Sequence, residues 1–160
     1  MGRIGTGAKA GLVSGVVYGA MSAVFAYISL LMIKEQMMVV IEETLLPDSL
    51  VTAEQIYEFL LIFGAVFVVI VGVVTGVILG VVYGWAYEKI PGGNSIYKGL
   101  VFGIILWAII DVLLGIGNVQ YDTTYFVLSL AWGLVIALIF GALLGIFYDK
   151  FTPKELANEN

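Results

Sequence analysis

The chain has 160 residues, of which 61% are hydrophobic and 12% are charged, and its formal net charge is −5. Soluble domains carry about 25% charged residues, so this composition excludes an ordinary soluble protein. The absence of histidine and cysteine excludes disulfides, thiolate or histidine metal sites and bis-histidine haem. The lack of a basic patch argues against a nucleic-acid partner. We therefore expect an all-α integral membrane protein with no cofactor and no bound metal.

Four apolar runs are long enough to cross a hydrocarbon core of roughly 30 Å, which takes about 20 helical residues. The runs comprise residues 8–33, 59–87, 99–116 and 125–148. The first run is too long for the apolar part of a typical signal peptide, so we expect it to remain in the protein. The sequence predicts four transmembrane helices in a single transmembrane domain, residues 1–160.

Glycines recur at every fourth position within the apolar runs. Residues at this spacing lie on one face of a helix, and small residues there let neighbouring membrane helices approach closely. We therefore expect glycine-zipper packing. The packing glycines are Gly7, Gly11, Gly15 and Gly19 in the first run, Gly72, Gly76, Gly80 and Gly84 in the second with Gly64 in phase, Gly99, Gly103 and Gly115 in the third, and Gly133, Gly141 and Gly145 in the fourth.

An extended acidic arm, residues 34–58, separates the first two runs. We expect the first helix to continue from about Thr6 to Leu46, which is roughly 60 Å at 1.5 Å per residue, and so to project beyond the membrane. Thr52 and Gln55 have the spacing of a capping box that starts the second long helix. The acidic residues of the arm are Glu42, Glu43, Asp48 and Glu54.

The arm also contains an apolar string, Met37 to Ile41. A solvated loop does not need so many apolar residues, so some of them must be buried. Two interpretations remain: the string packs within the protein, or the arm docks a partner.

The chain contains an internal repeat. Two pairs of strings match, 80–90 with 141–151 and 11–15 with 99–103. The longer strings share the order glycine, three residues, glycine, two residues, tyrosine, acid, lysine. The sequence therefore predicts two duplicated helical hairpins, residues 6–90 and 95–150, followed by a polar tail, residues 151–160. Parallel repeats of this kind are related by an axis along the membrane normal.

The basic residues predict the orientation of the four spans. Lys34 alone falls on the outer side of a four-span topology, and the others flank the opposite side. These others are Arg3, Lys9, Lys89, Lys98, Lys150 and Lys154. The positive-inside rule then places both termini in the cytoplasm of a multi-pass protein of the cell membrane. Glu88-Lys89 and Asp149-Lys150 are expected to be interfacial anchors.

Asp111 is the only charged side chain well inside an apolar run. Such an acid costs a few kcal/mol on insertion scales and usually faces the bundle interior or a water-filled cavity. In a continuous α-helix Asp111 shares a face with Gly103, Trp107 and Gly115. We therefore take Asp111, with Trp107, as the candidate intramembrane site.

Three roles for Asp111 remain open at this stage. The carboxyl group could hydrogen-bond a hydroxyl, such as that of Tyr27, Ser22 or Ser129, or reach water at the outer surface. It could bind a proton or a cation during transport. It could also contact a partner subunit.

Few other residues suggest chemistry. Trp85, Trp107 and Trp132 could stack on a planar ligand, but aromatic residues in apolar helices are more often packing residues. No histidine or lysine lies at helical spacing from the serines and threonines in the spans to act as a base. Hydroxyl groups in membrane helices commonly donate a hydrogen bond to a backbone carbonyl. We therefore expect no catalytic residue and no enzymatic activity.

The sequence favours a role in assembly, as a homo-oligomer or as an accessory subunit of a larger membrane complex. Its partners would then be the lipid bilayer and other membrane subunits or a second copy of itself. The alternative is a small transporter or an ion or proton channel that uses Asp111. In its composition the chain resembles small four-span proteins of prokaryotes, a resemblance that has no motif behind it and implies no activity.

Overall fold

The computed structural model describes residues 2–46, 49–113 and 123–152, and over these ranges it is helical without strands. Four of its helical segments are long and apolar enough to cross a membrane. The prediction of an all-α protein is confirmed, and the four spans are compatible with a multi-pass membrane protein. The elements are α1 (Arg3–Met32), α2 (Lys34–Thr44), α3 (Ala53–Ala86), α4 (Ser95–Trp107), the π-helix η1 (Ala108–Leu113) and α5 (Thr123–Phe151).

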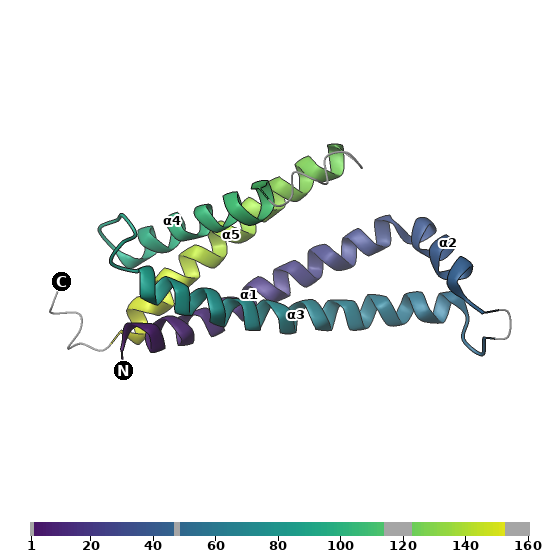
Figure 1. Ribbon diagram of the computed structural model, residues 1–160, viewed down its shortest axis with the longest axis horizontal. Coiled ribbons are helices and arrows are strands. Elements are labelled where there is room, and N and C mark those ends of the chain that lie inside the picture. Colours follow the sequence, from purple (N-terminus) through teal and green to yellow (C-terminus); the bar gives the residue numbers. More distant parts are fainter. Residues whose placement is uncertain (1, 47–48, 114–122, 153–160) are drawn as a thin grey trace.

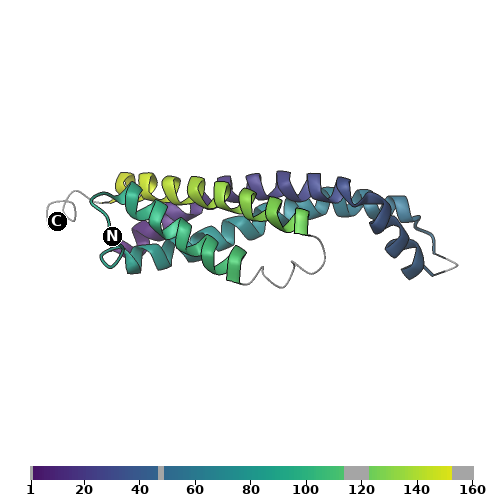
Figure 2. The ribbon, with the colours of Figure 1, turned by 90° about the horizontal axis from the view of Figure 1, so that it is seen from above.

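The long helices form two antiparallel pairs. Helix α1 packs along α3, α4 packs along α5, and the pairs meet mainly through α1 and α5. The second pair ends before the first pair does, as both views of the ribbon show (Figures 1 and 2). Arg3 forms an ion pair with Glu88, and Ser95 hydrogen-bonds Asp149. One end of the bundle therefore contains the starts of α1 and α4 and the ends of α3 and α5. We call this end of the bundle the basic end.

The backbones of α1 and α3 touch where glycines face each other. A Cβ atom built on Gly15 would lie 2.9 Å from both the carbonyl oxygen of Gly72 and the Cα of Gly76. Real Cβ atoms do not approach backbone atoms so closely, and one built on Gly11 would clash with the backbones of Gly76 and Gly80 in the same way. Only a residue without a side chain fits these positions.

The second pair of helices has similar contacts and one difference. Gly99 lies against the backbone of Gly141, and Gly103 lies against that of Ala137. Gly133 instead faces a side chain, that of Asp111. Gly115 lies outside the described residues. In the first pair, Gly64 makes no tight contact, because the nearest atom to its added Cβ is a Leu30 methyl carbon at 3.9 Å.

The expected continuous helix from Thr6 to Leu46 is wrong. Helix α1 ends at Met32, Ile33 leaves the helical conformation with φ −102° and ψ 20°, and α2 begins at Lys34. The break turns α2 back toward α3 (Figure 1). Its physical reason is burial of the apolar string, because a straight helix would leave that string in water.

The arm is attached to α3 by apolar and polar contacts. Ile41 is 6% exposed and packs with Ala53 and Tyr57, and partly buried neighbours surround these three. The Lys34 ammonium donates a hydrogen bond of 3.1 Å to Glu54 Oε1. This bond and the charge of Glu54 raise the pKa of Lys34 above its ordinary value. Part of the apolar string is therefore packed within the protein.

The remaining predictions for the arm have mixed outcomes. The capping box is confirmed, because Gln55 N–H donates to Thr52 Oγ1 and Thr52 N–H donates to Gln55 Oε1. Glu42 and Glu43 are exposed to solvent, and Asp48 lies outside the described residues.

Shortening Ile41 to alanine is expected to loosen α2 from α3. The substitution removes a buried side chain, and such truncations cost about 2–5 kcal/mol. Hydrogen exchange should become faster for the amides of α2 and stay unchanged for those around Gly76. Val40→Ala is the control, because Val40 is 55% exposed. Equal protection of α2 in both variants would show that α2 is not held by this contact.

Candidate intramembrane site

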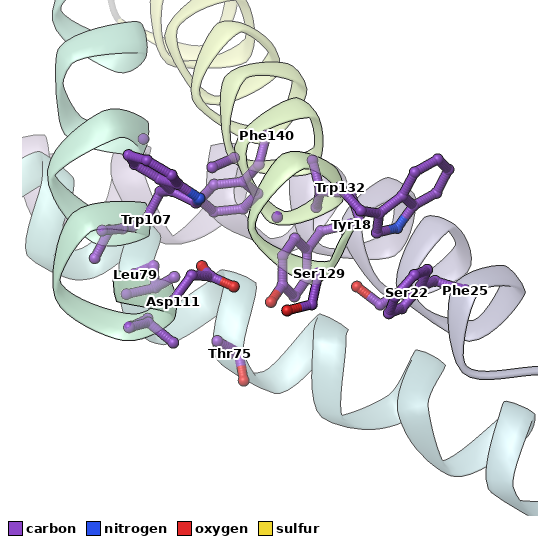
Figure 3. Close-up of a pocket in the computed structure, with 16 residues that line it drawn as sticks. Tyr18, Ser22, Phe25, Thr75, Leu79, Trp107, Asp111, Ser129, Trp132 and Phe140 are labelled. Carbon is purple, nitrogen blue, oxygen red and sulfur yellow. The ribbon is translucent and has the colours of Figure 1, made fainter. Parts of the chain in front are cut away.

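All four spans line a cavity of about 200 Å³ in the region where the two helix pairs meet. Its polar lining residues are Tyr18 and Ser22 from α1, Thr75 from α3, Asp111 from η1 and Ser129 from α5. Its aromatic lining residues are Tyr18, Phe25, Trp107, Trp132 and Phe140. Figure 3 shows the Asp111 carboxylate, the Tyr18 hydroxyl and the Ser129 hydroxyl directed into the same part of the cavity.

The two faces of α1 explain why a cavity forms. The glycine face packs tightly on α3. A second face carries Tyr18, Ser22 and Phe25, which are spaced by four and three residues and therefore point the same way. This face meets α5, where Tyr18 contacts the Phe140 ring edge-on at 5.5 Å between centroids. Large rings thus replace glycine at this contact, and the space between the pairs is lined by side chains.

Asp111 lies in the π-helical segment η1, not in a continuous α-helix as expected from the sequence. A π-helix has a wider turn, so the four-residue spacing no longer fixes which side chains share a face. Gly103, Trp107 and Asp111 nevertheless all line the cavity. Short π-helical segments are rare and often occur at functional sites.

The Asp111 carboxylate is half-buried and lies against α5. A Cβ built on Gly133 would come within 2.6 Å of Asp111 Oδ1, so the absence of a side chain there makes room for the acid. Two polar neighbours of Asp111 donate their hydrogen bonds to backbone carbonyls and not to its carboxylate. Trp107 Nε1 donates to the Leu130 carbonyl at 3.0 Å, and Ser129 Oγ donates to the Phe126 carbonyl at 2.8 Å.

The sequence supplies no basic side chain to neutralise Asp111. Neither lysine nor arginine occurs between Lys98 and Lys150, and none occurs between Lys9 and Lys34. Along α4 and η1, Asp111 lies roughly 24 Å from Ser95 at 1.5 Å per residue, which places it in the outer part of a hydrocarbon core of about 30 Å. Among the described residues that line the cavity none carries a positive charge, so the Asp111 carboxyl group is free to hold a proton or a cation from outside the chain.

The other predicted site residues fall in different places. Trp132 lines the cavity and stacks on Phe25, with 5.6 Å between ring centroids. Trp85 is 64% exposed and lies under the Lys89 ammonium, 4.4 Å from its ring centroid. Tyr27 is exposed and is not among the residues lining the cavity. Trp132 is thus placed to meet a cavity ligand, and Trp85 is not.

Sequence reasoning missed a polar chain at the basic end. Tyr87 donates to Ser95 Oγ, which donates in turn to Asp149, and the Tyr83 hydroxyl donates to the Ser95 carbonyl at 2.8 Å. Tyr87 and Tyr148 stack with 4.5 Å between centroids. The repeated tyrosine-acid-lysine strings were the available signal, but Ser95 lies outside them. Asp149 is therefore bonded within the bundle in addition to lying at a helix end.

The chain matches the model of a protein family over almost its whole length. The family is DUF6789, a family of unknown function, and the match covers residues 1–158. It includes both helix pairs, the arm and every residue that lines the cavity. No curated protein and no solved structure matches the chain.

Proposed function

The chain belongs to the DUF6789 family, and we propose that it is a small transporter that moves a monovalent cation, a proton or a larger ion, through the Asp111 cavity. The cavity is the observation that carries this proposal. All four spans line it, and among the described lining residues the only charged one is the acid. Acids inside membrane helices mark ion and proton pathways.

The charge of Asp111 favours transport over a purely structural role. An acid that only stabilises a bundle is expected to be held by donors or by a cation of the same chain. The ion pairs among the described residues, Arg3 with Glu88 and Lys34 with Glu54, do not involve Asp111. A lone carboxyl group beside hydroxyls is suited to gain and lose a proton or a small cation.

We also propose that the two helix pairs are duplicated hairpins joined by glycine-zipper packing. Gly7 lies against the carbonyl of Gly80 as Gly99 lies against that of Gly141. By these contacts, residue 7 of the first repeat is equivalent to residue 99 of the second. The matching strings suggest residue 11 as the equivalent of residue 99, which differs by about one helical turn. In transporters built from repeats, the substrate site lies near the repeat interface, and the Asp111 cavity lies where the two pairs meet.

The proposed orientation has both termini in the cytoplasm of a cell-membrane protein. Arg3 and Glu88 pair at the basic end, and Lys98 donates to the Tyr87 carbonyl there at 3.0 Å. Lys34 lies at the opposite end, on the arm. The excess of basic residues at the basic end favours the cytoplasmic side.

Vesicle flux tests the proposed function. The purified protein is reconstituted into liposomes that contain a pH-sensitive dye, and a pH gradient is imposed. Proton entry is expected to be faster than in protein-free vesicles, to be lost in Asp111→Asn and to be partly kept in Asp111→Glu. Permeability equal to that of empty vesicles under proton, sodium and potassium gradients would contradict the proposal, as would unchanged flux in Asp111→Asn.

Adding one methyl group at Gly133 is expected to lower this flux several-fold without unfolding the protein. The new Cβ of Gly133→Ala meets the end of a side chain, Asp111, and displaces it rather than the backbone. Gly64→Ala is the matched control within a span, because its Cβ meets nothing closer than 3.9 Å. Equal flux in the two variants would show that the position of the carboxylate does not matter.

Assembly, the role favoured by the sequence, remains a second candidate. Its support is an exposed aromatic face of α3. Phe59, Phe63 and Phe67 are spaced by four residues and are all more than half exposed, and part of α3 extends past the second helix pair (Figure 1). Copurification of a partner in mild detergent, or a dimer that Phe63→Ala disrupts, would support assembly. A monomer without partners would argue against it.

A further inference from the structure

We propose that the cation bound in the Asp111 cavity is a small organic ammonium ion that carries an apolar group. This inference rests on the proposed function and names the class of its substrate. It comes from three properties of the cavity: one acid and several aromatic rings, which Figure 3 shows together, and a limited volume.

The aromatic lining distinguishes an organic cation from an inorganic one. A ring attracts a cation placed over its face within about 6 Å, and recognition of alkylated ammonium groups by aromatic cages is the best-known use of this attraction. Tyr18, Trp107, Trp132 and Phe140 reach the cavity from three of the four spans. An apolar ammonium ion gains from these rings and from the carboxylate at once, whereas a hydrated metal ion gains little from the rings.

The oxygen ligands of the cavity are too few for a dehydrated divalent metal. Calcium takes six to eight oxygen ligands, commonly with several carboxylates. The described lining has one carboxylate and the hydroxyls of four residues, Tyr18, Ser22, Thr75 and Ser129. Among the described residues, no group of three acidic side chains comes together anywhere in the molecule. The single negative charge of the Asp111 carboxylate therefore suits a cation that carries one positive charge.

The volume sets the size of the ligand. A dry apolar cavity of about 150 Å³ is large enough to bind benzene. The Asp111 cavity measures about 200 Å³, which leaves room for one ring and a small ammonium head but not for a multi-ring cation. The ammonium head would lie beside Asp111, and the apolar group would lie toward Trp132 and Phe25.

The charge of the cavity couples binding of the ammonium ion to release of a proton from Asp111. Because no basic residue is among the described residues that line the cavity, the empty cavity is electrically neutral only when the Asp111 carboxyl is protonated. Binding of an ammonium ion then releases that proton, and release of the ammonium ion takes one proton up. The bound cation and the proton therefore exclude each other, and the two compete for the same carboxyl group.

The test uses the full-length protein in detergent and benzyltrimethylammonium as the probe. Binding is followed by calorimetry and by the tryptophan fluorescence of the protein. We expect saturable binding of one probe per chain, roughly a hundredfold weaker in Asp111→Asn and about tenfold weaker in Trp132→Leu. Trp132→Phe keeps a ring and should keep most of the affinity. Trp85→Leu is the control, because Trp85 does not line the cavity.

The outcomes separate this inference from the proposed function. Unchanged affinity in Asp111→Asn, or equally tight binding of neutral benzyl alcohol, would overturn the inference. No binding of the probe by a protein whose vesicle proton flux still depends on Asp111 would overturn the inference and leave the proposed function standing. Probe binding that depends on Asp111, in a protein that moves no ion across vesicles, would support the inference and overturn the proposed function.

Discussion

Replacing Gly80 with leucine is expected to prevent the first hairpin from packing. A Cβ at this position would lie 2.7 Å from the Cα and 2.9 Å from the nitrogen of Gly11, and both are backbone atoms that cannot move aside without moving α1. Leucine adds three more carbon atoms beyond that Cβ. The helices must separate, and the dispersion contacts along the interface are lost. The expected cost exceeds about 4 kcal/mol, a large part of the stability of a typical domain.

Unfolding in increasing fractions of SDS, together with size-exclusion chromatography in mild detergent, measures this effect. Gly141→Leu should disturb the second hairpin in the same way, because Gly141 contacts the backbone of Gly99. Gly2→Leu and Gly93→Leu are the controls, because nothing lies within 4 Å of a Cβ at either position. If Gly80→Leu unfolds at the same SDS fraction as the control variants, close backbone contact does not hold the hairpin together.

Asp111→Asn is expected to separate stability from activity. Asparagine has nearly the same shape but no charge, and the ion pairs among the described residues do not involve Asp111. An aspartate at the centre of a membrane helix costs about 2.5–3.5 kcal/mol, and Asp111, which lies in the outer part of its span, costs less than this. The variant should therefore be as stable as the wild type, or about 1 kcal/mol more stable, while its cation flux falls to that of empty vesicles.

Asp149→Asn is the matched comparison, because Asp149 is an acid that has a hydrogen-bond donor, Ser95, on another helix. Its exposed carboxylate accepts a hydrogen bond from Ser95. Asparagine can still accept this bond without the charge, so the expected loss is smaller than the about 1.5–3 kcal/mol of a hydrogen bond to a charged group. This variant should lose stability and keep its flux. An Asp111→Asn protein that is less stable and still transports would identify Asp111 as a structural acid.

The sequence predicts the helices well because their signals are local. Long apolar runs predict the spans, and the start of α3 follows from two residues, Thr52 and Gln55, whose side chains bond the nearby backbone. The glycine spacing predicts which residues face a neighbouring helix, and a Cβ added at Gly15 or Gly80 would meet the backbone of such a helix. Each of these features depends on residues within a few positions of one another.

The break at Ile33 and the π-helix around Asp111 could not be predicted in this way. Ile33 is an ordinary apolar residue, and the chain turns there because the distant side chains of Ala53 and Tyr57 bury Ile41. The π-helical segment 108–113 has no proline or glycine to mark it. Both features depend on contacts between elements.

The cavity was predictable only in part. Asp111 stands out because it is charged within an apolar run, and Trp107 shares its face in a helical pattern. Tyr18, Thr75 and Phe140 lie on three other helices, and nothing in their own surroundings distinguishes them from packing residues. Their convergence depends on how the two helix pairs meet, which no local pattern records.

Covalent modification of Asp111 tests most directly whether a cation passes this carboxyl group. A hydrophobic carbodiimide enters apolar regions and reacts with protonated carboxyl groups, and mass spectrometry identifies the modified residue. In vesicles containing the wild-type protein, we expect one adduct, on Asp111, and a loss of flux in proportion to the modified fraction. Complete modification of Asp111 with undiminished flux would contradict a pathway through the cavity.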